Sequence, residues 1–135
     1  MTTTGTHHAS SRIIILCTSV LLGITGVALI FAPVEVATAL GFRAAPSVAL
    51  VLELYGAALF GLAMTGWMVR GAIIGGIFGR SYVVGNAAHA FVGAFALIRH
   101  AMAPGATPAL VVLCAGYSLL AVVFGYLMFA ATPTS

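Results

Sequence analysis

The sequence contains very few charged side chains. Five arginines and two acidic residues are the only ones among 135 positions, which is 5% of the chain, and lysine is absent. A soluble domain carries about 25% charged residues, so this chain has too few to cover a surface that faces water. The arginines also stand singly, whereas nucleic-acid-binding surfaces need clustered cations. The composition therefore excludes a soluble domain and a nucleic-acid partner, and it indicates that the lipid bilayer surrounds most of the chain.

Cysteine and the familiar catalytic motifs are scarce or missing as well. Cys17 and Cys114 are the only two cysteines, and they form no C-x-x-C motif. Their expected depths in the membrane differ by roughly 15 Å, whereas the Cα atoms of a disulfide lie within about 7 Å of each other. The G-x-S-x-G and H-E-x-x-H motifs of hydrolases and metalloproteases do not occur. We therefore expect no cofactor, no bound metal and no enzyme activity of these kinds.

Long apolar segments are what the chain has in abundance. Hydrophobic residues make up 62% of the sequence, and the mean hydropathy is +1.20. The first uncharged segment, Ile13 to Phe31, is roughly 28 Å long as a helix, which is enough for a hydrocarbon core of about 30 Å. It is too long for the apolar region of a signal peptide, which has about 7–15 residues. Three further segments, 47–68, 81–98 and 109–130, complete the prediction of an all-α membrane protein, a four-transmembrane-helix bundle.

The segments outside these helices complete the predicted organisation. Pro33 ends the first helix, and the short apolar run that follows predicts an interfacial segment after helix one. Residues 1–11 are predicted to be a disordered cytoplasmic tail, because they are polar and lack periodicity. Residues 12–131 are predicted to form a single transmembrane domain, and residues 132–135 a C-terminal tail.

The arginines predict the orientation in the membrane. Four spans place both termini on one side, together with Arg12, Arg70 and Arg80, and leave Arg43 and Arg99 on the other. Because cytoplasmic loops carry the excess of positive charge, the termini are predicted to face the cytoplasm. We expect a multi-pass membrane protein with its N- and C-termini in the cytoplasm.

Small residues recur on one face of each predicted helix. Helices in lipid pack closely through such small residues, so these faces are predicted to point into the bundle. The glycine-rich connector between Arg70 and Arg80 has nine apolar residues and is too short to span; we interpret it as a close-packed or interfacial connector, or else as a re-entrant loop. The glycines predicted to mediate helix packing are Gly23, Gly56, Gly61, Gly93 and Gly125.

Polar side chains also lie within the predicted spans. Asn86 and His89 share one face of the helix over 81–98, because they are three residues apart. Counting from the outer ends of the helices places His89, Tyr55 and Tyr117 at roughly 13–15 Å depth, and Glu53 at roughly 10 Å. These five residues form the candidate intramembrane polar site.

Two interpretations of this site remain open. A carboxylate in a span costs about 2.5–3.5 kcal/mol on insertion scales, so Glu53 is expected to have a partner or a function. Glu53 and His89 would exchange a proton in a relay or polar-ligand site, with a tyrosine orienting the pair. Alternatively the polar groups only bond to one another, with Glu53 protonated or paired with Arg43. In both cases we expect Glu53, Tyr55 or Tyr117 within hydrogen-bonding distance of His89.

The middle of the chain resembles a known kind of membrane protein. The segments ELYGAALFGLAMTGWMVRG and IIGGIFGRSYVVGNAAHAFVGAFAL are similar to the middle of small four-helix bacterial inner-membrane proteins of the DoxX-like kind. The resemblance covers about residues 47–99 and rests on small residues and an aromatic belt. It implies an inner-membrane location and accessory links to redox systems, and it assigns no catalytic residue.

Two functions follow from these observations. The first is a structural or accessory membrane protein that packs with itself or with other membrane proteins through its glycine-rich faces. The alternative is a small oligomeric carrier or channel with a Glu53–His89 proton or polar-ligand site.

Overall fold

The fold is entirely helical over the residues that the structure describes. The computed structural model describes residues 3–72 and 76–130, with side chains described from 12 to 72 and from 76 to 129. Four of its helices contain segments long and apolar enough to cross a membrane, which confirms the predicted all-α four-span architecture. The elements are α1 (Thr3–Phe31), α2 (Pro33–Ala39), α3 (Pro46–Val69), α4 (Ile77–Ala101) and α5 (Pro108–Ala130).

Proline and glycine explain where these helices begin and end. Pro33, Pro46 and Pro108 stand at the starts of α2, α3 and α5, where the missing N–H group is not needed by the helix. The predicted interfacial segment is α2. It ends at Ala39, and Gly41 follows its C-cap with a φ of +84°, the left-handed conformation that glycine adopts without strain.

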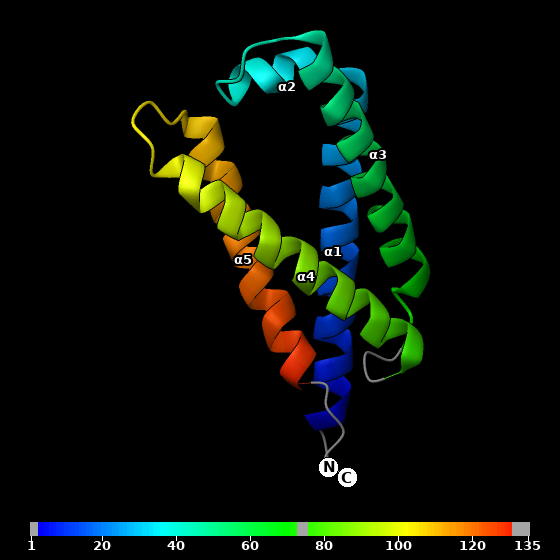
Figure 1. The fold of residues 1–135 in the computed structure, drawn as a ribbon. Helices are drawn as coiled ribbons and strands as arrows, with labels where there is room; N and C mark the ends of the chain where they lie inside the picture. Colours follow the sequence, from blue (N-terminus) through cyan, green and yellow to red (C-terminus); the bar gives the residue numbers. More distant parts are fainter. Residues whose placement is uncertain (1–2, 73–75, 131–135) are drawn as a thin grey trace.

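The first helix starts earlier than predicted. The described helix begins at Thr3, so it includes most of the segment 1–11 that we expected to be a disordered tail. Once a helix is formed, each further residue adds one hydrogen bond, so a polar segment joined to a long apolar span can extend it. The predicted tail 132–135 lies outside the described residues. The start of α1 and the end of α5 lie at the same end of the bundle (Figure 1).

The spanning helices are arranged as two pairs. Contacts between elements fall mainly within α1–α3 and within α4–α5, and α4 crosses α1 (Figure 1). The α1–α3 pair is close enough for backbone contact, because a Cβ atom added to Gly26 would lie only 2.7 Å from the carbonyl oxygen of Gly56. Gly56 therefore packs helices as predicted.

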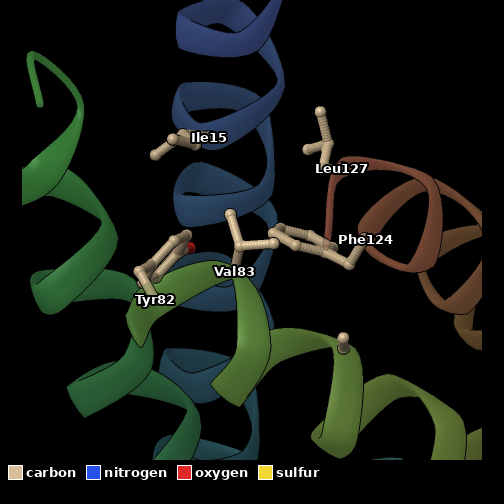
Figure 2. Packing of buried hydrophobic residues seen from close by; sticks show 6 residues of the cluster. Ile15, Tyr82, Val83, Phe124 and Leu127 are labelled. Carbon is tan, nitrogen blue, oxygen red and sulfur yellow. The ribbon is translucent and has the colours of Figure 1, made fainter. Parts of the chain in front are cut away.

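The two pairs meet at the end that holds the start of α1, which we call the closed end. Ile15, Val83 and Phe124 are buried there in one cluster with Tyr82 and Leu127 (Figure 2). The rings of Tyr82 and Phe124 meet edge to face, with centroids 6.1 Å apart. This cluster joins α1, α4 and α5 in a single core.

Gly66 brings α3 into the same junction. A Cβ atom added to Gly66 would overlap Ser19 Oγ and Tyr82 Oη. Ser19 donates a 2.7 Å hydrogen bond to the carbonyl oxygen of Ile15, and its Oγ lies 3.5 Å from Tyr82 Oη. Absence of a side chain at Gly66 therefore lets α3 approach α1 and α4 at once.

The remaining predicted packing glycines divide into three kinds. An added Cβ atom on Gly93 would overlap the ring of Tyr117, whereas Gly23 and Gly125 would be in ordinary contact with Ala63 and Phe91, at 3.5 and 3.6 Å. A Cβ atom added to Gly61 would have no described atom of another residue within 4 Å, so among the described residues Gly61 does not pack against another helix. Leu59 faces the core, and residues two apart lie roughly 200° apart around a helix, so Gly61 points away.

Candidate functional site

An apolar cavity separates the two helix pairs at the end opposite the closed end, which we call the open end. Its volume is about 630 Å³, and all four spanning helices and α2 contribute residues to its lining. Thr25, Tyr55 and Tyr117 are the only lining residues with polar side chains. Thr25 donates its hydroxyl hydrogen to the carbonyl oxygen of Leu21, at 2.9 Å. The oxygen of Thr25 can still accept a hydrogen bond, but only the two tyrosines have hydroxyl hydrogens that could be offered to a molecule in this cavity.

The short helix α2 covers the outer end of the cavity. Val36 and Leu40 contribute apolar side chains to the lining, and α2 extends from the end of α1 toward the connection between α4 and α5 (Figure 1). A Cβ atom added to Gly41 would be 2.9 Å from Thr107 Cγ2, in the connection between α4 and α5. The end of α2 thus reaches from one helix pair to the other.

Three side chains from three helices meet at the inner part of the cavity, and we call them the Tyr–His–Tyr cluster: Tyr55, His89 and Tyr117. Tyr55 Oη and Tyr117 Oη form a hydrogen bond. His89 Nε2 lies 3.1 Å from Tyr117 Oη and 3.4 Å from Tyr55 Oη. Because Tyr55 belongs to α3 and the others to α4 and α5, the cluster links the two helix pairs through polar atoms.

The local sequence explains why these groups meet. Gly93 follows His89 by one turn of α4 and leaves room for the ring of Tyr117, which is only 8% exposed. Tyr55 is 38% exposed, so it is the more exposed of the two tyrosines, and it also lines the cavity. The hydrogen bond expected between His89 and a tyrosine is present, and counting residues from the helix ends found all three members.

A second cavity lies against the same cluster. Its volume is about 390 Å³, and Tyr55, Ala88, His89, Val92 and Gly93 line it. His89 lines only this second cavity and Tyr117 only the first, whereas Tyr55 and Gly93 line both. The cluster therefore stands between two cavities.

Glu53 lies outside this cluster, so the structure does not form the Glu53–His89 pair, which was one of the two interpretations that the sequence left open. Its side chain is exposed, and within the described part of the chain it has no hydrogen bond or ion pair, with Arg43 or with any other residue. The reason is angular, because Glu53 and Tyr55 are two residues apart and lie roughly 200° apart around α3. Both can sit at suitable depths, but only one can face His89.

Asn86 is buried but serves another part of the molecule. Only 3% of it is exposed, and its Nδ2 donates a 3.0 Å hydrogen bond to the carbonyl oxygen of Tyr82 on its own helix. It shares a face with His89, as predicted, but lies roughly 4.5 Å further along α4 toward the closed end. Asn86 is therefore a structural neighbour of Tyr82 and does not join the Tyr–His–Tyr cluster.

The cluster is chemically suited to neutral polar groups. Tyrosine hydroxyls donate and accept hydrogen bonds, and a neutral imidazole can do either at Nε2 depending on its tautomer. The cluster has no carboxylate among its described members, and the described residues contain no group of three or more histidine, cysteine or acidic side chains that could hold a metal ion. Within an apolar cavity, such a cluster can orient one uncharged polar head by hydrogen bonds.

Comparisons with known proteins add no assignment. No protein-family model matches the chain, and searches of curated proteins and of solved structures likewise give no significant match. The DoxX-like resemblance therefore stays a prediction.

Proposed function

We propose that this small membrane protein binds a neutral, membrane-soluble molecule in the cavity at the open end. The observation that carries the proposal is the cavity of about 630 Å³, whose lining is apolar apart from the hydroxyls of Tyr55, Tyr117 and Thr25. Ligand sites have volumes of about 300–1,000 Å³, and a small number of polar groups in an apolar lining fix the ligand's orientation. The apolar body would lie between the helix pairs, and its polar head would bond to Tyr55.

The same observations favour a neutral ligand over an ion or a relayed proton. The predicted carrier mechanism needs Glu53 beside His89, and Glu53 faces away from it. An ion taken from water into an apolar site without a charged partner would lose several kcal/mol of hydration free energy. A neutral head group replaces its hydrogen bonds to water by hydrogen bonds to the cluster, so it does not lose this hydration free energy.

Binding can be tested with two molecules that share a carbon skeleton. Undecanophenone has a carbonyl group, and undecylbenzene has the same apolar body without oxygen. We expect nanodiscs that contain the protein to retain more tritiated undecanophenone than empty nanodiscs do. Because one hydrogen bond contributes about 0.5–1.5 kcal/mol, the ketone should bind about three- to tenfold more tightly than undecylbenzene.

A matched pair of tyrosine variants completes this test. Tyr55→Phe should remove the preference for the ketone and leave undecylbenzene binding unchanged. Tyr126→Phe is the control, because Tyr126 is 68% exposed and does not line the cavity. Equal binding of ketone and hydrocarbon by the unmodified protein would contradict the proposal.

The accessory role expected from the sequence is supported by a different face of the molecule. Glu53, Ala57 and Gly61 are exposed at intervals of four residues on α3, so they lie roughly along one side of the helix. Small residues at this spacing favour helix association in lipid, and an unpaired carboxyl group within a span favours a protein neighbour. Disulfide formation between copies that carry Gly61→Cys, in a background without Cys17 and Cys114, would test self-association.

We also propose that the protein lies in a bacterial inner membrane with both termini in the cytoplasm. Three arginines flank the side that holds the start of α1, against two on the other side. A reporter fused after Ser135 should be active only if it functions in the cytoplasm. Activity of a reporter that functions only in the periplasm would contradict this orientation.

A further inference from the structure

We propose that His89 sets whether the cavity presents a hydrogen-bond donor or an acceptor to its ligand, by its choice of tautomer. The inference rests on the proposed function and specifies its ligand class. The site would take apolar molecules with a carbonyl head and also those with an N–H or O–H head. The Tyr–His–Tyr cluster would accommodate both by reversing the direction of its hydrogen bonds.

The distances define the order of the chain. Tyr117 is the central member, because its hydroxyl bonds to Tyr55 and lies 3.1 Å from His89 Nε2. The direct distance from Tyr55 Oη to His89 Nε2 is longer, at 3.4 Å. Both tyrosines line the ligand cavity, and Tyr55 is more exposed than Tyr117. The chain therefore runs from His89 through Tyr117 to Tyr55, and the ligand head meets it at Tyr55.

In the first state, the hydrogen on His89 is at Nδ1. Nε2 then accepts a hydrogen bond from Tyr117, and the oxygen of Tyr117 accepts one from Tyr55. Both hydroxyl hydrogens are used inside the cluster. Only the lone pairs of the Tyr55 oxygen remain for the ligand, so this state binds a donor head.

In the second state, the hydrogen on His89 is at Nε2. Nε2 donates to the oxygen of Tyr117, and Tyr117 donates to the oxygen of Tyr55. The hydroxyl hydrogen of Tyr55 is then free to point at the ligand, so this state binds an acceptor head such as a carbonyl oxygen. The heavy atoms need not move between the states, because only hydrogens change position.

The second cavity makes the change of tautomer physically accessible. A tautomer change removes a hydrogen from one ring nitrogen and places one on the other, so it needs contact with a small proton carrier such as water. His89 lines the second cavity of about 390 Å³ and is not among the residues that line the ligand cavity. In this proposal a proton carrier would reach the imidazole through the second cavity while the ligand occupies the first.

The test uses two ligands, each of which allows only one direction of the hydrogen bond at its head group. Undecanophenone can only accept a hydrogen bond at its head, whereas 3-decylindole can only donate one, through its ring N–H. The protein is labelled with ¹⁵N-histidine in lipid nanodiscs, and the ring nitrogen resonances report the tautomer. We expect His89 to carry its hydrogen at Nε2 with the ketone and at Nδ1 with the indole. Both ligands should bind about three- to tenfold more tightly than undecylbenzene.

Internal controls make this measurement specific. His100 is exposed, and its Nδ1 lies 3.0 Å from the carbonyl oxygen of Ala96, so its signals should not change with either ligand. His89→Gln identifies the His89 signals by their loss. Tyr117→Phe removes the central hydroxyl but keeps a ring beside Gly93, and in this variant the tautomer of His89 should no longer follow the ligand.

The outcomes separate this inference from the proposed function. One tautomer, or a doubly protonated ring, in both complexes would overturn the inference, although binding of the ketone would still support the ligand site. If neither ligand bound more tightly than undecylbenzene, the proposed function itself would fail.

Discussion

The closed end and the open end of the bundle are built from the same kinds of residue, yet one is packed and the other is hollow. At the closed end, a large side chain of one helix pair fills the space left by a small residue of the other, as Tyr82 does at Gly66. At the open end, small side chains from both pairs face the same space, among them Ala28, Ala96 and Ala109. Whether a small residue packs or leaves a cavity therefore depends on the size of the side chain opposite.

The largest effect is expected at the closed end. Gly66→Leu would force a side chain into Ser19 and Tyr82, and overpacking of a close junction costs about 1–3 kcal/mol or more of unfolding free energy. Gly61→Leu is the control, because Gly61 has open space around it. Unfolding in mixed detergent micelles would measure both. Equal destabilisation by the two variants would show that the closed end is no tighter than the exposed face of α3.

An intermediate effect is expected when the open end is filled. Ala96→Phe would place a ring in the cavity, so we expect binding of undecanophenone and of undecylbenzene to fall together, by about tenfold or more, since a phenyl group takes the place of ligand atoms. The folded protein should keep its stability. Ala115→Phe on the exposed face of α5 should leave binding unchanged, and a similar loss there would show that the ligand does not occupy this cavity.

The smallest effect is expected for Glu53→Gln. The carboxyl group is exposed and has no partner among the described residues, so the unfolding free energy should change by no more than about 0.5 kcal/mol. Retention of tritiated undecanophenone should also be unchanged. A strong loss of ligand binding would mean that Glu53 contributes to the site after all, and it would revive the carboxylate-dependent carrier.

The sequence predicts depth along a helix better than direction around it. Tyr55, His89 and Tyr117 could be placed in one layer because each residue adds about 1.5 Å and the helix ends are marked by proline and arginine. The direction of Glu53 was mistaken because a position two residues from Tyr55 cannot share its face. The depth alone did not contain that information.

Other features depend on partners that no single helix specifies. Gly66 was missed because its importance comes from Ser19 and Tyr82, which belong to α1 and α4. Gly61 shows the same small-residue spacing, yet it packs against none of the residues that the structure describes. Residues from all five helices line the cavity. The spacing of residues within one helix does not show how much space remains between the helices.

The pairing of the helices has a mechanical consequence. The backbone contact at Gly26 and Gly56 holds α1 against α3, and the fit of Tyr117 against Gly93 holds α5 against α4. Each pair is thus held together by a close contact between its two helices. The closed end, where the pairs share a core, would be the pivot of any rotation of one pair against the other. A small rotation about this pivot would barely disturb the core, yet it would produce its greatest displacement at the far tips, where Gly41 and Thr107 touch. If the proposed ligand enters between the pairs, the Gly41–Thr107 contact and the hydrogen bonds of Tyr55 to Tyr117 and His89 are the contacts that would have to open, while each pair stays folded.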